Sequence, residues 1–153
     1  MDGSVSIIKL FCRDLTKELT IRQISKLLKK SYAYTNKEVW NLIKADILNK
    51  KEIGRSVVCS INLKNKTTRA LLTFNSAIES KDYNTAELKK NNVLTAFFSK
   101  NRLYIISNKK FKTSGKILTK QEFIDSVKQI GLDNDIVYGY EKYWEIIGDI
   151  YEK

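Results

Sequence analysis

The first part of the chain has short amphipathic stretches separated by polar breaks, and its apolar positions predict helices. Between residues 4 and 15 apolar side chains recur every three or four positions, the period of one helix face. Thr20 and Gln23 have the spacing of a capping box, in which two side chains satisfy two free backbone donors of the first turn. A second, short helix is therefore expected after Thr20. The residues expected on one face of it are Ile24, Leu27 and Leu28.

A third helix and a β-hairpin follow this segment. Ser31 can cap a helix over residues 31–46. The inward positions of that helix would be Thr35, Val39, Leu42 and Ile43. Residues 57–63 come after a turn at Gly54, and their second half alternates apolar and polar side chains, which predicts a hairpin with the strand before it. The region therefore predicts a helix-turn-helix followed by a two-stranded hairpin.

The second half of the chain is predicted to form a separate small α+β domain. Residues 66–80 return to helical spacing through Ala70, Leu71, Phe74, Ala77 and Ile78. The polar residues 80–85 are read as a linker, which gives domains at 1–80 and 88–153. In the second domain we expect a hairpin over residues 93–107, a helix capped by Thr119, and a last helix over residues 135–151.

Composition agrees with a folded α+β protein. The chain has 153 residues, of which 42% are hydrophobic, enough to bury a core. No apolar run approaches the roughly 18 residues needed to cross a bilayer, and the start lacks the basic segment of a secretion signal. The protein is therefore expected to be cytoplasmic, without a membrane partner.

The residue inventory gives little support for an enzyme. Histidine is absent, and no Gly-rich phosphate loop or serine-nucleophile motif is present. Cys12 and Cys59 lie far apart among apolar neighbours, so both are interpreted as packing residues. We expect no catalytic residue, no metal site and no cofactor.

Charge is distributed unevenly along the chain. The whole chain has 28 Lys and Arg residues against 17 Asp and Glu, a net charge of +11. Residues 21–55 contain nine of the basic residues and three acidic ones, whereas residues 133–153 contain six acidic and two basic ones. A basic early segment and an acidic end suggest different roles for the two regions.

The order of helix, helix, turn, helix and two-stranded wing resembles the winged helix-turn-helix fold of prokaryotic transcription regulators. The resemblance covers residues 4–80 and is carried by residues 19–28, residues 31–39 and the step from Ile47 to Leu48 into the wing. The stretch from Cys59 to Asn65, followed by a helix, is similar to archaeal regulators in which this module precedes a nucleotidyltransferase domain. The Gly-Ser and Asp-x-Asp elements of that enzyme are missing here.

The resemblance implies sequence-specific binding of double-stranded DNA, with the helix at residues 31–46 in the major groove and the wing at residues 51–58 on the backbone. Asn36 can pair with adenine and Lys37 with guanine or phosphate, while tyrosines can touch a thymine methyl or a phosphate. Trp40 could belong to the core edge or to the DNA-facing rim. The expected base readers are Tyr32, Tyr34, Asn36 and Lys37, and the expected backbone contacts are Arg22, Lys30, Lys44, Lys51 and Arg55.

Four alternatives stay open at the level of sequence. The basic residues of the first domain could be no more than solvated helix faces, or the winged helix could be an adaptor that contacts only protein. The acid-free hairpin region of residues 100–116 could bind RNA, although Phe97, Phe98 and Tyr104 favour packing over base stacking. The aromatic stretch of residues 135–152 could form a homodimer or cover its own domain.

Overall fold

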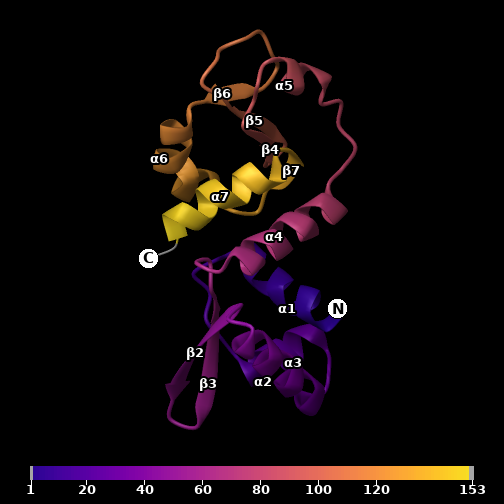
Figure 1. The fold of residues 1–153 in the computed structure, drawn as a ribbon, viewed down its shortest axis with the longest axis vertical. Helices are drawn as coiled ribbons and strands as arrows, with labels where there is room; N and C mark the ends of the chain where they lie inside the picture. Colours follow the sequence, from indigo (N-terminus) through magenta and orange to yellow (C-terminus); the bar gives the residue numbers. More distant parts are fainter. Residues whose placement is uncertain (1, 152–153) are drawn as a thin grey trace. The chain divides into compact units, whose positions relative to one another are not determined.

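The computed structural model describes residues 2–151, which form seven helices and two β-sheets (Figure 1). The contacts within the chain define two compact units, one ending at Leu72 and one running from Thr73 to Tyr151. The division falls inside helix α4 (Lys66–Glu79), whereas the sequence placed the domain boundary in the polar residues 80–85 that follow this helix. The chain is an α+β protein in which each unit has its own sheet.

The first unit combines three helices with a three-stranded antiparallel sheet. The strand order is β1-β3-β2, so β3 lies in the middle. Ile7 and Phe11 of the first helix, Ile24 of the second and Val39 of the third are fully buried, which joins the helices in one core. The elements in chain order are α1 (Asp2–Cys12), β1 (Leu19–Thr20), α2 (Ile21–Leu28), α3 (Tyr32–Lys44), β2 (Leu48–Ile53) and β3 (Ser56–Ile61).

Side-chain caps set the starts of α2 and α3, as the sequence predicts. The backbone N–H of Gln23 donates to the Thr20 hydroxyl at 3.1 Å, and the Gln23 side-chain oxygen accepts from the Thr20 N–H at 2.8 Å. The backbone N–H of Tyr34 donates to the Ser31 hydroxyl at 3.2 Å. Only three residues separate α2 from α3, because Lys29 takes a left-handed conformation that ends α2.

The predicted hairpin is formed by β2 and β3. Ile53 pairs with Ser56, so Gly54 and Arg55 make a two-residue turn. Gly54 has a φ of +60°, a conformation that a side chain disfavours and glycine accepts readily. Every residue of β2 after Leu48 is exposed, so the hairpin presents one strand to solvent.

The second unit places helices beside a four-stranded mixed sheet of order β6-β5-β4-β7. Strand β6 runs parallel to β5, and the other neighbouring strands are antiparallel. The elements after α4 are α5 (Ala86–Lys90), β4 (Thr95–Ser99), β5 (Arg102–Ile106), β6 (Lys116–Leu118), α6 (Lys120–Ile130), β7 (Asp135–Tyr138) and α7 (Tyr140–Tyr151). A second predicted capping box, from Thr119 to Glu122, is present at the start of α6.

Both faces of this sheet are covered by side chains. On one face the Phe97 ring lies 5.3 Å from that of Phe123 on α6 and 5.4 Å from that of Tyr143 on α7, measured between centroids. On the other face a buried cluster packs around Ala96 and Leu103. Its other members are Leu88, Val93, Ile105 and Val137, with Phe98, Phe111, Ile117 and Tyr138 packed against them. Phe97 is therefore a core residue, as its packing interpretation predicts.

The single helix predicted for residues 135–151 is wrong in its first part. Residues 135–138 form β7, which pairs with β4, and the helix begins only at Tyr140. Gly139 separates the two elements with a φ of +66°, and a Cβ atom at this position would lie 2.1 Å from the Leu94 carbonyl oxygen. The last residue of the stretch 135–152 lies outside the described residues.

The aromatic face of α7 is buried within the second unit. Tyr143, Trp144 and Ile147 are at most 4% exposed. The Trp144 indole donates a hydrogen bond of 2.7 Å to the Ser76 hydroxyl, and the Asn134 amide donates one of 2.9 Å to the Tyr143 hydroxyl. Tyr143, Trp144 and Ile147 thus cover their own unit, whereas Tyr140 and Tyr151 of the same predicted face are half-buried. A homodimer through this stretch stays a prediction.

Two predicted buried faces differ from the structure. Leu27 of α2 is 52% exposed, while Ile24 of the same predicted face is buried. On α4 the buried residues are Thr68, Leu72 and Asn75. Of the apolar residues from which this helix was predicted, Ala70, Phe74, Ala77 and Ile78 are exposed and Leu71 is half-buried.

Candidate nucleic-acid interface

A groove of about 420 Å³ lies in the first unit, between the starts of α2 and α3 and the turn of the β2–β3 hairpin. Its walls come from three segments that are separate in the sequence but belong to the same unit. No carboxylate is among its lining residues, whereas two arginines are. The lining residues are Thr20, Ile21, Arg22, Tyr32, Asn36, Trp40, Arg55, Ser56 and Val57.

Helix α3 supplies one wall through three residues spaced a full turn apart. Tyr32, Asn36 and Trp40 follow each other at intervals of four, so they lie in one row along the helix. Tyr32 is 53% exposed, and the other two are half-buried. The buried side of α3, with Thr35, Val39 and Leu42, lies roughly a quarter-turn around the helix from this row. Tyr32, Asn36 and Trp40 therefore lie beside the buried side of the helix, where they border the groove.

Trp40, which the sequence left undecided, is part of the groove wall. The ammonium nitrogen of Lys50 lies 4.9 Å from the centroid of the indole ring, within the range of a cation–π interaction. Lys50 also lies 3.9 Å from a carboxylate oxygen of Glu52, and both side chains are too exposed for this ion pair to add much stability. The indole thus forms an apolar surface in the groove with a cation beside it.

The structure brings together four of the nine predicted contact residues. Arg22, Tyr32, Asn36 and Arg55 line the groove. The other five are exposed on the same unit but do not line it; these are Lys30, Tyr34, Lys37, Lys44 and Lys51.

Two of those five lie well apart from the groove row of α3. A Cβ atom built on Gly3 of α1 would lie 2.5 Å from the Tyr34 hydroxyl oxygen, so this tyrosine is directed toward the start of α1. Lys44 ends α3, twelve residues after Tyr32, which places it about 18 Å further along the helix axis. Both residues therefore lie outside the row that lines the groove.

Thr20, Ile21 and Val57 also line the groove, and the sequence carries no functional signal for them. Thr20 and Ile21 were recognised as helix-start signals, and β1, which contains Thr20, is only two residues long. Thr20 pairs with Val58 of β3, and this pairing holds the start of α2 beside the hairpin. A two-residue strand carries too little periodicity to be recognised from sequence, so this link between helix and hairpin was missed.

The groove offers hydrogen-bond donors from Arg22, Asn36 and Arg55 and an apolar wall from Trp40. Arginine guanidinium groups suit phosphate oxygens, and an Asn amide can both donate and accept at the edge of a base. Within residues 2–151, no cluster of three or more His, Cys, Asp or Glu side chains could hold a metal ion. In the same described part, no helix has the length and hydropathy to span a membrane.

Cys59 lies behind this surface, at the centre of the sheet. It pairs with Leu19 of β1 and with Lys50 of β2, and its side chain is fully buried. Burial raises the pKa of the Cys59 thiol to about 11. Both cysteines are free thiols, and Cys12 is half-buried with its sulfur 3.5 Å from the Ile8 carbonyl oxygen.

Comparison with known proteins identifies no relative of this chain. No protein-family model, curated protein or solved structure matches the chain.

Proposed function

We propose that the first unit is a winged helix-turn-helix and that the protein is a transcription regulator that binds double-stranded DNA. The order of elements supports this proposal, because α1, β1, α2 and α3 are followed by the β2–β3 hairpin as the wing. The three-residue connection between α2 and α3 is the tight turn that such a module needs.

One observation carries the proposal: the groove gathers Arg22, Asn36 and Arg55 from three segments on one face without a carboxylate. The phosphate backbone of DNA attracts such a face, and base edges in the major groove are read by residues of an exposed helix. In this arrangement α3 lies in the major groove and the hairpin turn lies on the backbone. The exposed lysines around the groove add attraction for phosphates.

Each groove residue has a definite task in this proposal. Asn36 pairs with an adenine edge, and Tyr32 contacts a thymine methyl or a phosphate. Arg22 at the start of α2 and Arg55 in the hairpin turn hold phosphates beside α3. Lys37, the residue after Asn36 on the same helix, reaches a guanine or a phosphate, while Lys30 in the turn before α3 and Lys51 on strand β2 contribute backbone contacts.

The test is a selection of duplex sites from a random DNA library, followed by fluorescence anisotropy at one fixed salt concentration. We expect the full chain to prefer the selected duplex over single-stranded RNA of the same length. Charge reversal on the reader helix, Lys37→Glu, should abolish this preference, while Lys64→Glu, an exposed lysine beyond the far end of β3, should have a smaller effect.

Two results would contradict the proposal. A preference for single-stranded RNA would favour the basic hairpin region of residues 100–116 as the binding surface. Unchanged binding in Lys37→Glu would show that α3 does not contact nucleic acid, as expected for a module that binds only protein.

A further inference from the structure

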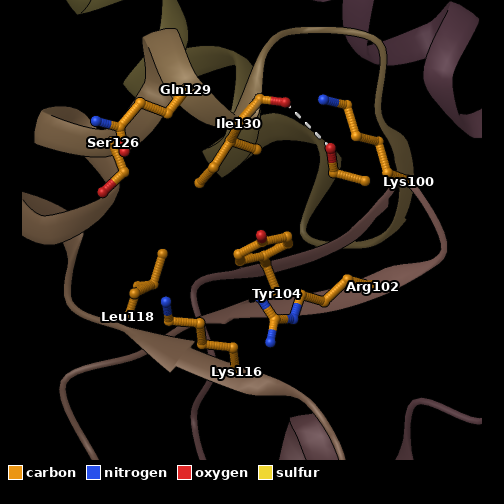
Figure 2. A pocket seen from close by; sticks show the side chains of 9 residues that line it. Lys100, Arg102, Tyr104, Lys116, Leu118, Ser126, Gln129 and Ile130 are labelled. Carbon is orange, nitrogen blue, oxygen red and sulfur yellow. Dashed lines mark hydrogen bonds between the residues drawn. The ribbon is translucent and has the colours of Figure 1, made fainter.

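The second unit contains a pocket that the proposed function does not use. It has a volume of about 370 Å³ and lies between the sheet and helix α6 (Figure 2). Lys116, Arg102 and Tyr104 come from the sheet, while Ser126 and Gln129 come from the helix on the other side. The remaining lining residues are Ser99, Lys100, Leu118 and Ile130.

The pocket is strongly cationic. Lys100, Arg102 and Lys116 are all exposed, and no carboxylate lines the pocket. Within the described part of the chain, none of the three forms an ion pair. The stretch of residues 88–121, which supplies all three cations, has no acidic residue, so its net charge is strongly positive.

The local fold explains why these side chains converge. Lys100 and Asn101 form the two-residue turn between β4 and β5, with φ of +50° and +64°, and Arg102 follows at once as the partner of Ser99. Lys116 of β6 is the register partner of Tyr104 on the neighbouring strand. The three cations therefore reach the pocket from a turn and from two adjacent strands.

Two further contacts hold the shape of the pocket. The Tyr104 ring stacks on the buried Phe97 ring, with centroids 5.5 Å apart and planes inclined by 18°. The Ser99 hydroxyl donates a hydrogen bond of 3.1 Å to the Ile130 carbonyl oxygen, which ties the end of β4 to the end of α6 (Figure 2). Tyr104 is thus positioned by the core, with only part of its side chain buried.

We propose that this pocket binds a small molecule bearing a phosphate group. A guanidinium and two ammonium groups match the several charges of a phosphate ester, and the Tyr104 hydroxyl and Gln129 amide can donate further hydrogen bonds. Leu118, Ile130 and the Tyr104 ring give an apolar wall for the remainder of the molecule. The volume lies within the range of roughly 300–1,000 Å³ that small-molecule sites occupy.

The site is independent of the proposed DNA interface, because all of its lining residues belong to the second unit. Its chemistry fits two sources of phosphate, an inorganic polyphosphate or a nucleotide. Isothermal titration calorimetry of the full chain with pyrophosphate and with ATP, at about 50 mM salt to limit screening, distinguishes them. Tripolyphosphate is the control with the same three phosphates as ATP: tighter binding of ATP than of tripolyphosphate identifies a nucleotide, and equal binding identifies the phosphate groups alone.

Matched variants test which cations are responsible. Arg102→Gln and Lys116→Gln should each weaken binding of the tighter probe about tenfold or more, as expected for charge-assisted hydrogen bonds. Lys109→Gln and Lys112→Gln remove the same charge from exposed positions of the same acid-free stretch outside the pocket, and should change affinity less than about twofold. Lys116→Arg should retain binding.

Three results would overturn the proposal. One is the absence of heat for both pyrophosphate and ATP at about 1 mM, where even weak sites are detected. Another is an equal loss of affinity in pocket and control variants, which would show that only net charge matters. The third is a pocket-dependent affinity for a single-stranded oligonucleotide with none for the two small probes, which would make the surface a nucleic-acid site.

Discussion

Asn36 lines the groove of the first unit, and Lys37 is the next residue on the exposed side of the same helix. If α3 reads base edges, Asn36→Ala and Lys37→Ala should each weaken binding to the selected duplex by about 1–3 kcal/mol and relax base preference. Competition anisotropy with single-base variants of the site measures both effects. Asn41→Ala, an exposed Asn on the same helix outside the groove, is the control, and full affinity in both test variants would remove α3 as the reader.

Arg55 lies in the hairpin turn, where a phosphate contact carries no sequence information. Arg55→Ala or Lys51→Ala should lower affinity for every duplex alike and reduce the slope of log affinity against log salt by about 0.9 for each lost contact. Lys64→Ala is the matched control, since Lys64 is exposed beyond the opposite end of β3. An unchanged slope in both hairpin variants would leave the hairpin without a role at the backbone.

Cys59 links the stability of the protein to alkaline pH. Because its pKa is raised by burial to about 11, the folded state holds the thiol proton more tightly than the unfolded state does. The contribution of this thiol to the free energy of unfolding is constant below its ordinary pKa of about 9 and falls as pH rises toward 11, by at most about 3 kcal/mol. Urea unfolding of the parent and Cys59→Ala at pH 8 and pH 10.5 measures this, and equal losses in both proteins would exclude the thiol as the cause.

At the scale of elements, α4 shows that apolar spacing does not always identify the buried face. Leu72 is fully buried, whereas Ile78 is 63% exposed. Leu72→Ala should therefore lower the free energy of unfolding by about 2–5 kcal/mol, and Ile78→Ala should change it by less than about 1 kcal/mol. Chemical denaturation compares the two, and the reverse order would restore the face predicted from sequence.

A chemical signal at the end of an element predicted where that element starts or turns, whereas α1 and α4 were predicted from apolar spacing alone. Thr20, Ser31 and Thr119 cap α2, α3 and α6 through hydrogen bonds that depend on side-chain type, and Gly54 marks the hairpin turn. Periodicity alone was less reliable. Ile136 and Tyr140 have helical spacing, yet they lie on different elements because β7 pairs with β4, a partner about forty residues away.

Part of the candidate site could be predicted from the sequence, because some of its residues carry a charge or occupy a recognisable place on a helix or turn. Arg22, Asn36 and Arg55 were identified from charge and from their place on expected helices or turns, and the structure places them around one groove. Sequence could not show that Tyr34 turns toward Gly3 or that Trp40 lines the groove, because both depend on how α1 and β2 pack beside α3. The pocket around Tyr104 depends on the pairing of β5 with β6, which no local pattern encodes.

At the scale of the whole molecule, the role of α7 bears on the state of assembly. Trp144 is 4% exposed and hydrogen-bonded within its own unit. Trp144→Ala should therefore lower the free energy of unfolding by about 3–5 kcal/mol without changing the oligomeric state of the folded protein. Light scattering and thermal unfolding of both proteins provide the test, and a parent dimer that becomes a folded monomer in the variant would support the homodimer predicted through residues 135–152.

At the turn between β4 and β5, the residue that favours ligand binding differs from the residue that would favour stability. Lys100 adopts a φ of +50°, a left-handed conformation that is unfavourable for a residue with a Cβ atom and that glycine accepts readily. Replacing it with glycine would relieve roughly 1 kcal/mol of backbone strain, and would also remove one of the three cations at the pocket. A search for more thermostable variants would thus select against the phosphate site, and natural selection for ligand binding would preserve a turn that is weaker than it could be.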